Sequence, residues 1–88
     1  MKTLADLKRR VQPGVKLLAL EHWQPKHIGV VRTVTRIQGN GYYYVIPGDE
    51  REMWSNYGKS SEFTFPTVNS YRYESAGKGW TLEFVEAA

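Results

Sequence analysis

Residues 28–46, IGVVRTVTRIQGNGYYYVI, decide the fold. Val, Ile and Thr dominate Ile28–Gln38, and Tyr42–Ile46 combines three tyrosines with two aliphatic residues. Such residues favour strands, and the intervening Asn-Gly accepts the positive φ angles of a tight hairpin turn. We therefore predict two antiparallel strands joined by Gly39-Asn40-Gly41. The apolar residues change face between Val30-Val31 and Ile37, which indicates a bulge or a strong bend.

Further strands are predicted on both sides of this hairpin. Upstream, Val15–Trp23 is apolar enough for a strand and ends before Pro25. Downstream, short strands are predicted at Arg51–Trp54 and Phe63–Phe65. The last third predicts a second hairpin, in which aromatic and apolar residues alternate with polar ones on either side of a turn at 76–79 (Tyr71, Tyr73, Trp80, Leu82 and Phe84).

A short helix is predicted over about residues 3–11. Thr3-Leu4-Ala5-Asp6 is a variant of the capping box, in which the first and fourth residues satisfy each other's backbone N–H groups. Leu4, Leu7 and Val11 form one apolar stripe, and Pro13-Gly14 ends the element. A helix this short is unstable alone, so it must dock on the sheet.

The 88 residues predict a single, mainly β domain over 1–88. We expect a small SH3-like barrel or a strongly bent antiparallel sheet of five to seven strands, with one short N-terminal α-helix over an opening. Either form hides strand edges. A flat sheet with the helix across one face is the alternative. The predicted core is Leu4, Leu7, Val11, Leu18, Leu20, Val30, Val34, Tyr44, Ile46, Phe65, Leu82 and Phe84.

Composition and motifs exclude several functional classes. The chain has no Cys, which fits a reducing, cytoplasmic setting, and no apolar run approaches the roughly 20 residues of a membrane span. Neither a nucleophile elbow, nor a phosphate-binding glycine loop, nor a zinc-protease motif is present, so we expect no enzyme and no cofactor. His22 and His27 could meet across a loop, but Glu21 is the only acid nearby, so we expect no metal site.

Charge is distributed unevenly along the chain. Residues 1–36 hold eight basic and two acidic side chains, a net charge of +6, whereas residues 37–88 carry −3. Lys8, Arg9, Arg10 and Lys16 are candidate contacts to phosphates or to an acidic protein surface. A solvated helix with exposed strand positions explains the same pattern.

Aromatic residues near the predicted loops are the stronger signal. We predict partner contacts by an aromatic and basic set, because Trp, Tyr and Arg dominate interface hot spots. Its members are Trp23, Arg32, Arg36, Tyr43, Trp54 and Tyr57. The rings could also stack bases or simply pack the ends of the domain. Arg32 and Arg36 are four residues apart, so a regular strand puts both on one face, with Lys16 as a candidate neighbour. Cross-strand pairing with acids such as Glu74 or Glu83 is the alternative use of the arginines.

The chain also resembles short uncharacterised proteins of bacterial and phage genomes over about two-thirds of its length. The similar residues are Leu4-x-x-Leu7-Lys8-Arg9, Pro13-Gly14, Arg32-Thr33-Val34, Gln38-x-Asn40-Gly41-Tyr42, Trp54 and Lys59. The resemblance transfers no activity. It implies a product of a phage or mobile element, many of which inhibit host machinery, anti-CRISPR proteins among them.

We accordingly expect a non-enzymatic inhibitor that docks on a host protein or nucleoprotein complex. A small-barrel nucleic-acid-binding protein is the first alternative, and a structural phage component is the second. No membrane partner is expected. The sequence leaves the oligomeric state open.

Overall fold

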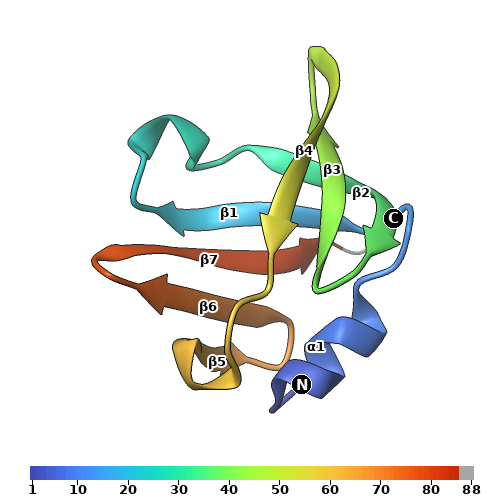
Figure 1. The fold of residues 1–88 in the computed structure, drawn as a ribbon. Helices are drawn as coiled ribbons and strands as arrows, with labels where there is room; N and C mark the ends of the chain where they lie inside the picture. Colours follow the sequence, from blue (N-terminus) through green and yellow to red (C-terminus); the bar gives the residue numbers. More distant parts are fainter. Residues whose placement is uncertain (86–88) are drawn as a thin grey trace.

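A seven-stranded antiparallel sheet, bent across itself, dominates the computed structural model, which describes residues 1–85 (Figure 1). The sheet order is β4-β3-β2-β1-β7-β6-β5. The strands are β1 (Lys16–His22), β2 (Val31–Gln38), β3 (Gly41–Ile46), β4 (Asp49–Asn56), β5 (Phe63–Thr67), β6 (Ser70–Ser75) and β7 (Lys78–Val85). The predicted bent sheet is thus confirmed, and β4 and β5 remain its two edges instead of closing a barrel. Residues 86–88 of the predicted domain lie outside the described residues.

Bulges account for much of the bend. In the β2–β3 ladder Val34 pairs with Tyr44 but Arg36 pairs with Tyr43, so Thr35 is an extra residue on β2. The β1–β7 ladder has a similar irregularity at Leu20. An extra residue bends the strand that carries it and increases the local twist. As a result β3 and β4 cross the direction of β1 and β7 (Figure 1).

The inward face of β1 differs from the prediction. Leu17 and Ala19 are buried, whereas Leu18 is only half-buried and Leu20, at the bulge, is 41% exposed. The stretch 17–20 is apolar at every position, so alternation alone could not decide which residues point inward. Pairing with β7, which places Leu17 opposite Phe84 and Ala19 opposite Leu82, makes that choice.

The rest of the predicted core is largely confirmed. Six of its residues are buried (Leu7, Val11, Val34, Tyr44, Leu82 and Phe84), and three more pack partly buried against them (Leu4, Ile46 and Phe65). Val30 is also half-buried. The core further contains Leu17, Ala19, Tyr42, Tyr57, Phe63 and Tyr71. Its tyrosines make this interior more polar than an aliphatic core.

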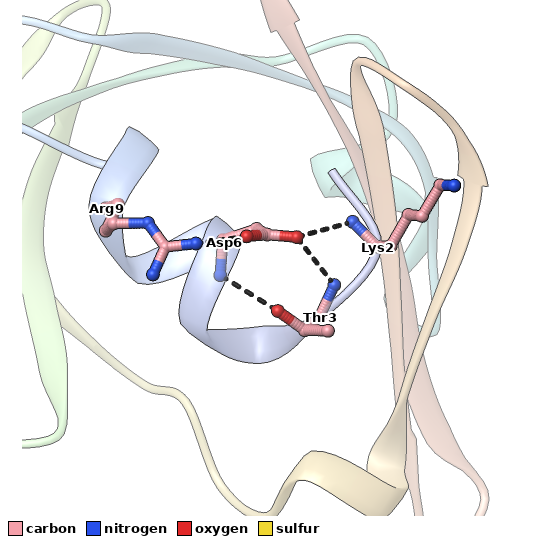
Figure 2. A network of polar contacts seen from close by, with 4 residues as sticks. All are labelled: Lys2, Thr3, Asp6 and Arg9. Carbon is pink, nitrogen blue, oxygen red and sulfur yellow. Dashed lines mark hydrogen bonds and ion pairs between the residues drawn. The ribbon is translucent and has the colours of Figure 1, made fainter.

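The helix α1 (Leu4–Arg10) begins with the predicted capping box (Figure 2). The Asp6 N–H donates to the Thr3 hydroxyl at 3.1 Å, and the Asp6 carboxylate accepts from the backbone N–H groups of Thr3 and Lys2 at 3.2 and 3.0 Å. Arg9 pairs with the same carboxylate. These backbone donors hold the pKa of Asp6 below its usual value.

Two side chains of α1 tie it to hairpin turns at one end of the sheet. The Lys8 ammonium donates to the Asn40 side chain in the β2–β3 turn at 2.8 Å. Arg10 donates to the Val68 carbonyl and the Asn69 amide oxygen in the β5–β6 turn. Because Leu7 and Val11 are buried beneath it, α1 covers this end as predicted. Within residues 1–85, no helix has the length and apolar character needed to cross a membrane.

Candidate functional site

A groove of about 290 Å³ opens between the two halves of the bent sheet. One wall comes from β3 and β4, the other from β6 and β7, and the connection between β1 and β2 completes it. Seven of its lining residues carry aromatic or imidazole rings (His22, Trp23, His27, Tyr44, Trp54, Tyr73 and Trp80). The groove therefore gathers residues that are far apart in sequence onto one concave surface.

Three rings form a stack along the groove. The His22 ring lies parallel to the Trp80 ring, with centroids 5.5 Å apart, and Trp80 stacks in turn on Tyr73 at 4.7 Å. This follows from the ladders, because His22 pairs with Trp80 across β1–β7 and Tyr73 pairs with Trp80 across β6–β7. His27, from the 3₁₀ turn η1 (Pro25–His27), rests on His22 at 4.4 Å. The stack lines one side of the groove.

Arg32 brings a positive charge to the interior side of this groove. Arg32 is only 5% exposed, yet it lines the groove. Its guanidinium carbon lies 4.1 Å from the centre of the Tyr44 ring, and one nitrogen donates to the Tyr42 hydroxyl at 3.3 Å. The Tyr42 hydroxyl also hydrogen-bonds the Tyr71 hydroxyl at 3.1 Å. No acidic side chain among residues 1–85 forms an ion pair with Arg32.

The bulge at Thr35 separates the two arginines that were predicted to share a face. Arg32 lies two residues before Val34, so it shares the inward face of β2. The extra residue then reverses the alternation, and Arg36 points outward. The predicted common face, with Lys16 beside it, is therefore wrong; Lys16 is exposed on β1 opposite Thr33.

The pKa values of both groove histidines are lowered, so both rings are neutral at pH 7. Burial lowers the pKa of His22 to about 4, with further contributions from nearby His27 and Arg32. Burial also lowers the pKa of His27, together with Lys26 and Arg32. The Gln24 N–H donates to His22 Nδ1 at 3.0 Å, so the proton of the neutral ring sits on Nε2. Arg32 is then the one lining residue charged at neutral pH.

The outer face of β2, β3 and β4 carries a second cluster, which we call the outer patch: Arg36, Tyr43 and Trp54. The Arg36 guanidinium lies 4.0 Å from the Tyr43 ring centre, and the Tyr43 and Trp54 ring centroids are 4.9 Å apart. Arg36 also pairs with Glu52 at 3.3 Å. Trp54 is 46% exposed and borders the groove as well, so it joins the two surfaces. Three predicted contact residues thus come together here.

Trp23 and Tyr57 have opposite placements. Trp23 is 44% exposed at the groove rim, with the Lys78 ammonium 5.0 Å from its ring centre. Tyr57 is only 4% exposed, so the expectation that it lies on the surface is wrong. Its ring packs against Tyr42, with centroids 5.6 Å apart. The segment after β4 folds back over the core because the Tyr57 N–H donates to the Asn40 carbonyl at 2.8 Å.

The three basic residues of α1 are held by intramolecular contacts. Arg9 pairs with Asp6, and Lys8 and Arg10 bind the two hairpin turns described above. The Arg10 guanidinium also covers the Phe84 ring at 4.1 Å. These side chains therefore secure α1, and they do not line the groove. Lys16 lies apart from them on β1.

His22 and His27 do meet, as the sequence suggested they could. A zinc site needs a third protein ligand, and the described residues contain no group of three or more His, Cys, Asp or Glu side chains placed to hold a metal.

Sequence reasoning missed Tyr73 and Trp80 as groove residues and misplaced Arg32. Two-residue alternation with Val34 was the signal that Arg32 points inward. Tyr73 and Trp80 were recognised as members of an aromatic face, but the bend that turns this face toward β3 and β4 comes from long-range pairing.

No protein-family model matches this chain, and neither the curated proteins nor the solved structures contain a significant match to it.

Proposed function

We propose that this is a non-enzymatic binding protein that docks on a larger protein through the groove and the outer patch. The observation that carries the proposal is the position of two tryptophans. Trp23 and Trp54 come from different parts of the chain, are 44% and 46% exposed, and border the same groove. Half-exposed tryptophans around a concave surface are the kind of residue that anchors protein interfaces.

We further propose that the protein inhibits the target on which it docks. The resemblance to short phage and mobile-element proteins suggests a host protein or nucleoprotein complex as the target, in the cytoplasm and without a cofactor. A standard interface takes about 800 Å² from each partner. The protein exposes 5476 Å² over its described residues, so docking would occupy a substantial part of one side.

The charge arrangement supports a protein partner over direct nucleic-acid binding. Arg9, Arg36, Arg51 and Arg72 are all paired with carboxylates, so the chain does not present them as a row of free cations. Phosphate tracking needs several cations along one path. The groove offers aromatic rings and one guanidinium instead.

The test compares capture of partners by tagged wild-type protein and by the Trp23→Ala/Trp54→Ala double variant. Val68→Ala is the matched control, because Val68 is 70% exposed and does not border the groove. Quantitative mass spectrometry of host-lysate eluates should show a partner that the wild type and the control retain and the double variant loses.

Equal recovery with all three baits would refute docking at this site. For the inhibitor form, the captured complex is assayed with and without added wild-type protein. A loss of its activity that the double variant does not cause is expected, and unchanged activity would rule inhibition out.

A further inference from the structure

We propose that the groove receives an acidic side chain from an extended segment of the partner, and that Arg32 binds its carboxylate. The inference rests on the proposed docking function and specifies the chemistry of the ligand. It assigns to Arg32 a role as an anion receptor that the fold itself does not require.

The first argument is the incomplete pairing of a buried charge. Arg32 is 5% exposed, and a guanidinium can donate five hydrogen bonds. The structure provides one, to the neutral Tyr42 hydroxyl at 3.3 Å. The other guanidinium nitrogens are not among the buried atoms that lack a partner in the described residues, so they are open to the groove and available to a ligand. Buried charges are normally paired with an opposite charge because their desolvation is costly. The four arginines with carboxylate partners, all elsewhere in the described chain, show that this sequence pairs such groups readily.

The second argument is that Arg32 is the only charged group at neutral pH among the residues that line the groove. A single planar guanidinium matches one carboxylate, which it can bind through two parallel hydrogen bonds. A chain of phosphates would require more cations than the groove has. Their lowered pKa values keep His22 and His27 uncharged at neutral pH, so Arg32 is the charge inside the groove, and the Lys78 ammonium adds a second positive charge outside it, beside Trp23 at the rim.

The third argument concerns the shape of the occupant. The groove volume of about 290 Å³ suits one or two side chains. A second hollow of about 210 Å³ adjoins it across His22 and Trp23 and contains Glu21, Arg72 and Glu74, whose charges sum to −1. An extended segment running over both hollows would meet a positive site and then a negative one. The faces of Trp80 are already covered by His22 and Tyr73, which leaves edges for peptide contacts and little free ring face for bases.

The experiment is an NMR titration with a capped tripeptide that has glutamate between two phenylalanines, so that its side chain is the only carboxylate. The same peptide with glutamine is the neutral control. Saturable shifts are expected at the Trp23 and Trp80 indole N–H signals and at Arg32 Nε–H. The glutamine peptide should bind about tenfold or more weakly, because hydrogen bonds between charged groups are stronger than neutral ones.

Two variants locate the carboxylate. Arg32→Met should weaken binding of the glutamate peptide about tenfold or more, whereas Arg51→Met, which removes the same charge from an exposed site outside the groove and the outer patch, should not. If Arg32→Met does not fold, the wild-type titration decides, because the glutamate must shift Arg32 Nε–H more than Arg36 Nε–H. Equal binding of both peptides, equal binding by the folded Arg32→Met variant, or no binding would overturn the inference.

Inorganic phosphate and a ten-nucleotide thymidine strand are titrated in parallel. Tighter binding of either than of the glutamate peptide would also overturn the inference, since it would assign the site to phosphates. The carboxylate role of Arg32 and the docking proposal can fail independently of each other. If the tryptophan double variant loses the partner while Arg32→Met retains it, docking stands and the carboxylate role of Arg32 falls.

Discussion

Arg32 is a largely buried guanidinium whose one side-chain hydrogen-bond partner is a neutral hydroxyl, and this predicts an uncommon mutational effect. Replacing a buried, incompletely paired charge with an apolar residue of similar size is often neutral or stabilising. The Tyr42 hydroxyl keeps Tyr71 as a partner after the change. We expect Arg32→Met to raise the free energy of unfolding by about 1 kcal/mol, measured by urea denaturation. Arg36→Met, at an exposed site, should change it by less than about 0.5 kcal/mol. A marked loss of stability in Arg32→Met would mean that Arg32 is structural.

Tyr57 is a second buried residue whose polar group can be removed with an expected gain in stability. Its hydroxyl is buried without a hydrogen-bond partner among the described residues, and burial raises its pKa. An unsatisfied buried hydroxyl costs about 1–3 kcal/mol. Tyr57→Phe should therefore raise the free energy of unfolding by about 1 kcal/mol, whereas Tyr57→Ala should lower it by several times that amount. Thermal unfolding of both variants checks the prediction, and a less stable Tyr57→Phe would indicate an unseen partner for the hydroxyl.

The lowered pKa of His22 predicts that the folded protein loses stability in mild acid. Its native pKa is about 4, whereas an unfolded histidine titrates near 6.5. Between these values the unfolded chain binds more protons than the native state, so stability falls as the pH decreases from 6.5 to 4. Because the ring is partly exposed, we expect a loss of about 1 kcal/mol rather than the full value of the shift. The difference between wild type and His22→Gln in urea denaturation at pH 7 and pH 4.5 isolates this contribution. An NMR titration midpoint near 6.5 for His22 would contradict it.

At the level of elements, the capping box at the start of α1 is predicted to matter because the helix is so short. It has seven residues and depends on its N-terminal hydrogen bonds and on docking of Leu7. Thr3→Ala removes the hydroxyl acceptor of the Asp6 N–H and should lower the free energy of unfolding by about 1 kcal/mol. Thr3→Ser keeps the acceptor and should stay close to wild type. Chemical denaturation distinguishes the two, and equal stability would show that docking alone holds the helix.

Most elements could be predicted from the sequence because their signals are local. The capping box, the Asn-Gly turn and the alternation of Trp80, Leu82 and Phe84 each act within a few residues. The inward face of β1 could not, since apolar residues occupy both faces and only pairing with β7 selects Leu17 and Ala19. The full length of β4 was also missed, because residues 49–50 (Asp-Glu) and 55–56 (Ser-Asn), which extend the predicted Arg51–Trp54, have weak strand preference and are held by the ladder to β3.

For the whole molecule, the pairing of its cations predicts weak nucleic-acid binding. The net charge is only +3, and four of the arginines form ion pairs with carboxylates within the fold. Affinity for a single-stranded oligonucleotide should fall less than about tenfold between 50 and 200 mM salt, against the 10³-fold or more of proteins with many phosphate contacts. Fluorescence anisotropy at several salt concentrations measures this. A steep dependence would favour the nucleic-acid alternative over the protein partner.

Some of the residues that line the groove could be predicted from the sequence, but their assembly into a groove could not. The sequence indicated surplus aromatic residues and named Trp23 and Trp54, and both border the groove. Its lining residues, however, come from every strand except β5, and their meeting depends on the bend of the whole sheet. Patterns within one strand carry no information about which distant strand it will face, so Tyr73 and Trp80 were not connected with Arg32.

The extra residue at Thr35 places the two arginines of β2 on opposite faces of the sheet. Before it, β2 points a guanidinium into the groove, and after it the same strand points one at the outer patch. Removing or adding one residue here would exchange inside and outside for the rest of the strand, an error that no nearby substitution could repair. Insertions and deletions in related chains should therefore be confined to the turns. The part of β2 around Thr35 should tolerate substitutions far better than an inserted or deleted residue.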